Sequence, residues 1–281
     1  MMHSARIVSV RDVTAKVRWL ELQLLPPSSC HGTQHKLTFR PGQWADFALP
    51  LTSNFPAVGG YSYVSAPQQL AKQQIVEFLV QKEQLPRPHT MTNWIHSTSC
   101  VPGVEVELRT GGNFVVDDGS GTFADVDNDQ TETRQAPAET HLVAAGIGIT
   151  PFLSFLRAAQ WSKRTLDHVF LAYAVRHKED AVFLDKIEEM VDQNGLQFRL
   201  LESGRLGRKL AVEDFLLHSS HSTKKQQDKN SSTKYYLCGP PEFSISMEKQ
   251  MRSPKYGIKN IFYENWWSPN PHGRLIQPKR T

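Results

Sequence analysis

The chain has 281 residues, of which 39% are hydrophobic and 21% charged, and its formal net charge is +4. This length allows two domains of ordinary size, each able to bury a core. No run of Lys and Arg is dense enough for a nucleic-acid surface, and no apolar stretch reaches the roughly 20 residues of a membrane span. Cys30, Cys100 and Cys238 are far apart. This spacing argues against a disulfide framework, a zinc site or an iron–sulfur cluster, and indicates a reduced, intracellular protein.

Residues 1–116 have the pattern of a β domain. Short strands separated by turn residues are predicted at 17–24, 44–49, 61–65, 75–80 and 104–108. Strands at this spacing indicate a small barrel or sandwich. A short helix is expected at 92–96, with Thr92 as a candidate cap.

Residues 117–139 are acidic and polar, which predicts a solvated loop or linker between two domains. The spacing Asp125-x-Asp127-x-Asp129 is similar to the start of a calcium-binding loop. However, Gln130 and Ala136 stand where an EF-hand needs Gly and Glu. We therefore reject an EF-hand and predict no metal site.

Residues 140–281 alternate strand and helix. Strands are predicted at 141–145, 168–173, 196–201, 234–238 and 259–264, and helices at 151–160, 180–191, 211–217 and 241–252. This alternation predicts a parallel sheet covered on both faces. Ligands of such sheets bind at the carboxyl ends of the strands.

A glycine turn follows the first of these strands, and its residues are Gly146, Ile147, Gly148, Ile149, Thr150 and Pro151. Thr150 suits a helix cap, and Pro151 suits the first helical position. A helix start presents free N–H groups and a partial positive charge, which suits a phosphate. Pro151 occupies the place of the third glycine in the usual dinucleotide fingerprint, so a tight strand–helix turn without a ligand is the alternative.

Two further segments are candidates for the same chemistry. Cys238, Gly239 and Pro240 end a strand and precede a helix, so they could form a second wall of one crevice; a buried Cys beside an ordinary turn is the alternative. Tyr61 and Ser62 begin a strand of the β half. A Tyr face can stack on a flat ring, and a Ser hydroxyl can donate or accept a hydrogen bond beside it.

The order of these segments resembles the ferredoxin–NADP reductase superfamily. The segments that carry the resemblance are Gly59-Gly60-Tyr61-Ser62, the helix start from His89 to Ile95, the glycine turn, Gly239-Pro240-Pro241-Glu242-Phe243 and Tyr263-Glu264-Asn265-Trp266-Trp267. The resemblance runs from about Ala5 to Trp267. It implies a six-stranded antiparallel FAD-binding barrel in residues 1–116, followed after the linker by a parallel-sheet α/β NAD(P)-binding domain in residues 140–281.

The resemblance also implies roles for individual residues. Tyr61 would stack on the flavin ring, Ser62 would bond near its reactive N5, and the backbone around Val80 would line it. The flavin pyrophosphate would be held by Met91, Thr92 and Asn93. Glu264 would lie near the flavin, with Trp266 as an aromatic cover.

On the nicotinamide side, the resemblance implies that the glycine turn from Gly146 to Pro151 cradles the dinucleotide. Cys238, Gly239 and Pro240 would border the nicotinamide. The candidate catalytic residues are Ser62, Cys238 and Glu264. Together these roles predict a flavin-dependent oxidoreductase that passes hydride from NAD(P)H to FAD. Because no Cys cluster or haem motif is appended, the electron acceptor is expected to be another molecule.

One departure from the superfamily pattern leaves an alternative open. Gly59 occupies the position of the Arg in R-x-Y-S, so an Arg introduced there is expected to tighten FAD binding. The alternative is a non-catalytic nucleotide-binding or interaction module that lost tight flavin binding. The choice between NADH and NADPH also stays open, since Arg205 and Arg208 could meet a 2′-phosphate or simply lie on a solvated loop. The resemblance suggests a mitochondrial protein, while the little room for a presequence suggests a cytoplasmic one.

Overall fold

The computed structural model describes residues 1–26, 36–50, 57–83, 90–119, 137–208, 210–216 and 233–264. The described chain forms two compact units. The first contains Met1–Val115 together with the helical segment Thr150–Trp161, and the second contains the other described residues. The chain therefore leaves the second unit for one helix and then returns to it. From the sequence, that helix was expected within a single domain of residues 140–281.

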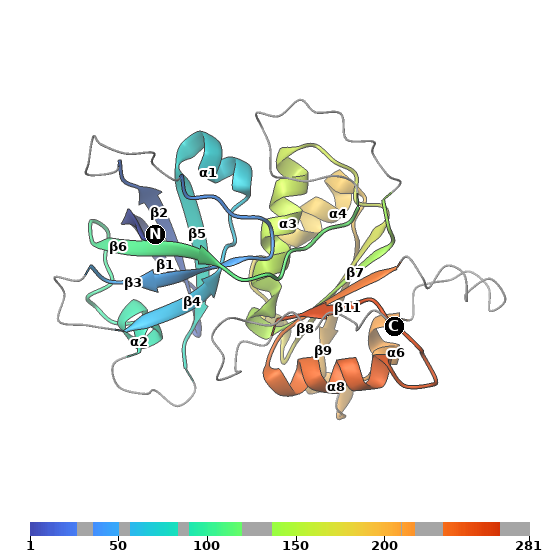
Figure 1. Ribbon diagram of the computed structural model, residues 1–281. Helices are drawn as coiled ribbons and strands as arrows, with labels where there is room; N and C mark the ends of the chain where they lie inside the picture. Colours follow the sequence, from blue (N-terminus) through green and yellow to red (C-terminus); the bar gives the residue numbers. More distant parts are fainter. Residues whose placement is uncertain are drawn as a thin grey trace. The chain divides into compact units, whose positions relative to one another are not determined.

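The first unit is built on six antiparallel strands, shown in Figure 1. They are β1 (His3–Thr14), β2 (Val17–Leu24), β3 (Trp44–Ala48), β4 (Val58–Ser62), β5 (Ile75–Gln81) and β6 (Glu105–Gly111). Their order in the sheet is β4-β3-β6-β1-β2-β5. An antiparallel bridge between Tyr63 and Phe78 then joins the end of β4 to β5 and closes the sheet. The predicted six-stranded antiparallel barrel is confirmed.

Strand β1 is an element that the sequence patterns did not reveal. Ala5 and Ile7 are fully buried, as alternation requires. The register against β2 then shifts between Ile7 and Ser9 and again between Asp12 and Thr14. Such bulges break the two-residue period, so the second half of this strand does not alternate in the sequence.

Three helices complete the first unit: α1 (Pro67–Gln73), α2 (Met91–Ile95) and α3 (Thr150–Trp161). Sequence analysis did not predict α1. In α2 the cap is Thr90, whose Oγ1 accepts a hydrogen bond from the N–H of Asn93 at 3.2 Å. The expectation that Thr92 caps this helix is therefore wrong by half a turn, and the hydroxyl of Thr92 is used elsewhere.

The second unit is built on five strands in which every pairing is parallel. They are β7 (Thr140–Ala145), β8 (Val169–Val175), β9 (Gln197–Glu202), β10 (Lys234–Cys238) and β11 (Ile261–Tyr263). The order is β11-β10-β7-β8-β9, so the chain moves outward on one side of β7 and then crosses to its other side. The reversal lies between β7 and β10. The predicted parallel sheet is confirmed, and ligands of such sheets bind outside the carboxyl ends at this reversal.

Helices cover both faces of this sheet. Helix α4 (Leu184–Asn194) lies on one face, and α6 (Val212–Leu216) and α8 (Pro241–Met251) lie on the other (Figure 1). A single helical turn, α5 (Ser203–Leu206), follows β9. Helix α4 starts later than the predicted residue 180. Residues Lys178–Asp180 form a separate 3-10 turn (η2), and Phe183 has a φ of +53°, which interrupts the helical path.

The predicted linker begins as an integral part of the second unit. Asp118 is completely buried and pairs with the guanidinium of Arg164 at 2.5 Å and with Nε2 of His168 at 3.0 Å. Its neighbour Asp117 pairs with Nζ of Lys234 at 3.2 Å. A buried carboxylate needs such partners, because an unpaired charge in the interior is costly. These two acids therefore attach the start of the predicted linker to the second unit. Residues 120–136, which include the rejected calcium motif, lie outside the described residues.

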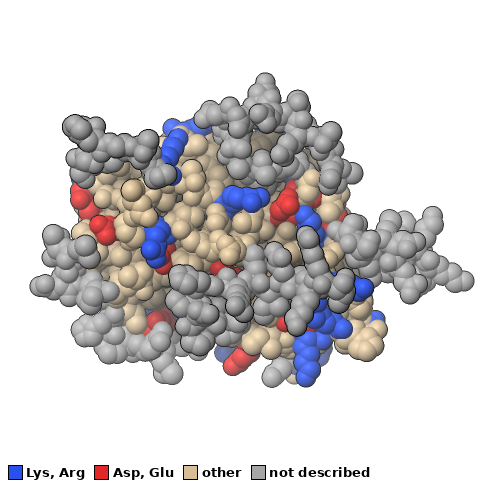
Figure 2. Space-filling model, viewed as in Figure 1, with Lys and Arg blue, Asp and Glu red and all other residues tan. Residues whose placement is uncertain are grey.

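The described surface carries both signs of charge. On the face drawn in Figure 2, Lys and Arg lie mostly interspersed with Asp and Glu, apart from one group of basic side chains at the lower right. Among the described residues, several charged side chains form surface ion pairs, such as Arg6 with Glu105 at 2.8 Å. Within the described ranges, no helix combines the length and the apolar character needed to cross a membrane.

Candidate functional site

Two glycine turns meet at the carboxyl edge of the parallel sheet, on either side of the chain reversal. The 3-10 turn Gly146–Ile149 (η1) follows β7, and Cys238 with Gly239 follows β10. A Cβ on Gly148 would lie 2.6 Å from the nitrogen of Gly239 and still closer to the carbonyl of Cys238. Only glycine permits so close an approach of two backbones. The structure thus brings together the two segments that sequence analysis had proposed as walls of one crevice.

Gly146 serves a different purpose from Gly148. Its φ is +55°, a conformation that side chains resist, and nothing lies within 4 Å of the place where a Cβ would be. The backbone at Gly146 therefore faces open space. Helix α3 begins four residues later at Thr150, so its first N–H groups follow the turn directly along the chain. An exposed glycine backbone followed by a helix start has the properties of a phosphate cradle.

The loops after β8 and β9 are joined to each other at the same edge of the sheet. The hydroxyl of Ser203 donates to the carbonyl of Val175 at 3.1 Å. The N–H of Gly204 donates to the carbonyl of Arg176 at 2.9 Å. The carboxyl edge of the sheet is therefore bordered by connected loops on both sides of β7.

The two Arg residues considered for a 2′-phosphate already have carboxylate partners. Arg208 makes a two-pronged ion pair with Asp214, with distances of 2.8 and 2.6 Å. Arg205 pairs with Glu202 at 3.1 Å. A phosphate at these positions would have to compete with an internal carboxylate, so neither residue is a ready anion ligand.

The flavin-side prediction centres on Tyr61, and its ring has a defined place in the barrel. Its hydroxyl lies 3.0 Å from Oγ1 of Thr92, and its ring meets the ring of Phe47 edge-on at 6.0 Å. Burial raises the pKa of Tyr61 to about 12, although the bond to Thr92 opposes this rise. The phenol therefore stays neutral at physiological pH and keeps its proton for hydrogen bonding.

The ring of Tyr61 occupies the space beside Gly59, the position at which the R-x-Y-S pattern has an Arg. A Cβ on Gly59 would lie 2.7 Å from Cζ of Tyr61 and closer still to its hydroxyl. The Tyr61 ring thus lies where any side chain at position 59 would begin. The expectation that Gly59→Arg tightens FAD binding did not include this contact, which leads us to expect weaker binding instead.

The other predicted flavin-side residues are mostly buried. Ser62 is 9% exposed at the end of β4, and Val80 and Met91 are almost completely buried. Any contact of Val80 or Met91 with a ligand would therefore use backbone atoms. The N–H of Asn93 is already committed to Thr90.

The remaining predicted residues lie in the second unit or outside the described chain. Glu264 is buried directly after β11, and Cys238 is partly exposed at the end of β10. Trp266 lies outside the described residues. Ser62, Cys238 and Glu264 keep their catalytic roles as predictions.

A buried ionic cluster in the first unit was missed at the sequence level. Glu77 on β5 is 7% exposed, and its carboxylate accepts hydrogen bonds from Nε1 of Trp19 at 2.8 Å, Nε2 of Gln69 at 2.8 Å and a guanidinium N–H of Arg157 at 2.7 Å. Burial raises the pKa of Glu77, but the charge of Arg157 and the three hydrogen bonds outweigh burial and lower it below its usual 4.5. One charged residue inside the apolar run 75–80 is the signal that could have revealed this cluster.

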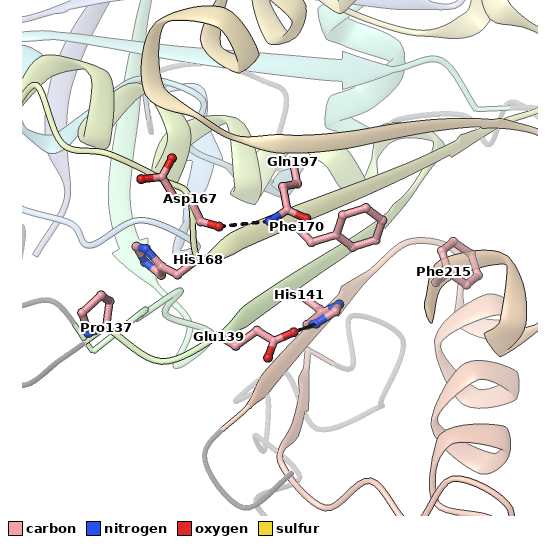
Figure 3. Close-up of a pocket in the computed structure, with 8 residues that line it drawn as sticks. All are labelled: Pro137, Glu139, His141, Asp167, His168, Phe170, Gln197 and Phe215. Carbon is pink, nitrogen blue, oxygen red and sulfur yellow. Dashed lines mark hydrogen bonds and ion pairs between the residues drawn. The ribbon is translucent and has the colours of Figure 1, made fainter. Parts of the chain in front are cut away.

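A separate cavity of about 330 Å³ lies at the opposite, amino edge of the parallel sheet, shown in Figure 3. The cavity is lined by His141, Phe170 and Gln197, which lie at the beginnings of β7, β8 and β9. Nε2 of His141 pairs with Glu139 at 3.1 Å. This cavity is not at the edge where the glycine turns lie, so it does not belong to the predicted dinucleotide site.

The chain thus combines a closed antiparallel barrel with a parallel sheet that carries paired glycine turns at its reversal. Residues 142–249 match the family described as "Oxidoreductase NAD-binding domain". The second part of the chain is thus similar in sequence to oxidoreductase NAD-binding domains.

A named relative and two solved structures are similar to the chain over most of its length. "Oxidoreductase NAD-binding domain-containing protein 1" of Xenopus laevis is 27% identical over 278 residues, covering 94% of this chain and 79% of the relative. The flavohem-like FAD/NAD-binding domain of nitric oxide dioxygenase from Vibrio cholerae superposes with a TM-score of 0.65 at 18% identity, covering 93% of this chain and 97% of that one. The CS-b5R domains of human Ncb5or, in an NAD+ form, give a TM-score of 0.62 at 20% identity and cover 94% and 69%.

Proposed function

We propose that this chain is an NAD(P)H-dependent flavin oxidoreductase that passes hydride from the nicotinamide to FAD and electrons on to a separate acceptor molecule. The observation that carries the proposal is the paired glycine turns at the reversal between β7 and β10, with an open, left-handed Gly146. Bound FAD would supply the redox chemistry, while the protein's residues bind and orient the reactants.

The dinucleotide side fits an elongated anionic ligand. Gly146 offers backbone without a side chain, and the start of α3 at Thr150 offers N–H groups and a partial positive charge to a pyrophosphate. Gly239 and Cys238 form the opposite wall, because their backbone contacts that of Gly148. In this proposal the thiol of Cys238 borders the nicotinamide.

The flavin side fits a planar ring system beside neutral hydrogen-bonding groups. Tyr61 offers an aromatic ring whose hydroxyl is already oriented by Thr92. Ser62 would place its hydroxyl where negative charge develops as hydride arrives, and such a contact counts most in the transition state. In this proposal the N–H groups of Met91 and Thr92 face the pyrophosphate, since that of Asn93 is used by the Thr90 cap. In this proposal Glu264 and Trp266 complete the surroundings of the flavin.

The relatives support both cofactors. The Vibrio cholerae domain binds FAD and NAD according to its description, and the human structure was solved in an NAD+ form. The alternative of a non-catalytic module is not favoured by these likenesses. A mitochondrial and a cytoplasmic location are both compatible with the proposal.

The test is the spectrum of the purified full chain, followed by an anaerobic titration with NADH and with NADPH. We expect a flavin spectrum that bleaches when nicotinamide is added. The matched variant is Gly146→Trp, in which an indole fills the open space above the turn; it should keep its flavin and fail to bleach. A colourless protein that stays colourless after incubation with FAD would contradict the proposal, as would a flavin that neither nicotinamide reduces.

A further inference from the structure

The buried Glu77–Arg157 pair connects the barrel to the helix that begins at the glycine turn. Arg157 is the single charged residue of α3, and its side chain is 20% exposed, while that of Glu77 is 9% exposed. Both partners thus lie largely out of water, and a buried pair keeps its place only where further hydrogen bonds satisfy it. Trp19 and Gln69 supply those bonds from β2 and α1.

A second buried contact fixes the same helix one turn nearer its start. Oγ of Ser154 donates to the carbonyl of Ser65 at 2.8 Å, and both serines are fully buried. The hydroxyl of Ser65 in turn accepts the N–H of Glu77 at 3.1 Å. The two anchors therefore form one connected network, and hydrogen-bonded networks of this kind rigidify a core.

The network ends on segments with predicted cofactor roles. Ser65 follows Ser62 by three residues, and Glu77 precedes Val80 by three residues on β5. At the other end, Arg157 and Ser154 lie within two turns of Thr150, the first residue of α3. All of these residues belong to the first compact unit. One compact unit thus holds the start of α3 together with the strands of the proposed flavin side.

We propose that the Glu77–Arg157 pair is a positioning device for hydride transfer, which fixes the phosphate-binding start of α3 on the flavin-side strands of the barrel. This rests on the proposed function. The two residues act through α3 and β5 and do not touch the reacting atoms. Misplacing bound reactants by about 1 Å can lower a rate about a hundredfold, so a pair that sets this distance has a large effect without binding either reactant.

The experiment compares three variants of the full chain. Arg157→Met keeps the aliphatic stem and removes the charge, and Arg157→Lys is the conservative replacement. Arg109→Met is the matched control, because Arg109 pairs with Asp46 on the exposed side of the same barrel. Two measurements are made on each: hydrogen–deuterium exchange of the peptide covering residues 150–161, and the rate of flavin reduction as a function of NADH concentration.

We expect Arg157→Met to exchange α3 amides at least about tenfold faster. Its limiting reduction rate should fall about 10- to 100-fold, while flavin content and half-saturating NADH change less than about threefold. Arg157→Lys should recover part of the rate, and Arg109→Met should match the parent in both measurements. If Arg157→Met does not fold, the same split is expected, in weaker form, for Ser154→Ala.

Each other outcome overturns the proposal in a distinguishable way. Faster exchange with an unchanged limiting rate would make the pair merely structural. Loss of flavin from Arg157→Met would assign the pair to flavin binding instead. A parent protein that NADH and NADPH do not reduce overturns the proposed function itself, and a parent that is reduced no faster than Arg157→Met overturns only the positioning role.

Discussion

The proposed dinucleotide side and the proposed flavin side of this chain depend on different kinds of contact. The dinucleotide side is backbone against backbone: Gly148 and the Cys238–Gly239 turn are too close for a Cβ. On the proposed flavin side, the contacts are made by a side chain. The Tyr61 ring covers the backbone of Gly59, and its hydroxyl lies within hydrogen-bond distance of the Thr92 side chain. Backbone contacts need glycine at a fixed place, whereas side-chain contacts can be satisfied by several combinations of residues. This explains why the first side has readable local motifs and the second departs from its family pattern.

The largest effect is expected where backbones touch. Gly148→Val would drive side-chain atoms into the carbonyl of Cys238 and the nitrogen of Gly239. We expect a loss of about 3 kcal/mol in the free energy of unfolding, measured with urea, because overpacking a tight site forces the backbone to shift. NADH binding should be lost with it.

Gly146→Ala is the matched control for this substitution. It adds a methyl group to the same turn in open space, so only the left-handed φ opposes it, at a cost of about 1 kcal/mol. Equal stability losses in Gly148→Val and Gly146→Ala would show that the two turns do not pack as described.

The flavin side should respond through Tyr61. Gly59→Arg would displace the Tyr61 ring and separate its hydroxyl from Thr92, so we expect weaker FAD binding, by about tenfold, in a fluorescence titration. Tyr61→Phe, which removes the hydroxyl and keeps the ring, should have a smaller effect. Tighter binding by Gly59→Arg would mean that the cation outweighs the displaced ring.

The pH dependence of the free energy of unfolding tests the Glu77 cluster independently of both proposed cofactor sites. The folded-state pKa of Glu77 lies below 4.5, so its contribution is complete above pH 4.5 and is lost as the pH falls through the lower folded value. Arg157→Met removes the charge that most strongly opposes the effect of burial, so the pKa of Glu77 should rise above 4.5. The loss of about 3 kcal/mol expected at pH 7 should then shrink as the pH falls through the raised pKa, because protonation of Glu77 stabilises the folded variant. A stability difference between parent and variant that does not change with pH would contradict this assignment.

The smallest effect is expected for the choice between NADH and NADPH. Because Arg208 is held by Asp214, Arg208→Gln should change the ratio of kcat/KM for the two nicotinamides by less than about threefold, measured by steady-state oxidation. A larger loss of NADPH activity would show that Arg208 leaves Asp214 for the 2′-phosphate.

The sequence predicted both folds and most element positions because the signals are local. Periodicity located the strands, and the glycine turns located the carboxyl edge of the parallel sheet. The features that escaped, namely the full course of β1 and the placement of α3 in the first unit, depend on non-local contacts. The bulges of β1 are imposed by pairing with β2, and α3 joins the barrel through Glu77, which lies 80 residues away from Arg157.

The candidate site divides in the same way. The proximity of the turns at Gly148 and Gly239 could be inferred from strand order in a parallel sheet. The contact of Tyr61 with Gly59 could not, because it depends on a side-chain rotamer. The burial of Asp118 depends on Arg164 and His168, which the sequence does not place beside it.

Single-turnover reduction of the bound flavin tests the central claim most directly. The flavinated full chain would be mixed anaerobically with NADH or with NADH deuterated at C4, and the flavin band followed by stopped flow. We predict bleaching that is slower with the deuterated nicotinamide. In Ser62→Ala, we expect bleaching to slow by a further factor of about ten to a thousand at unchanged flavin content. A flavin band that neither NADH nor NADPH bleaches would contradict the account.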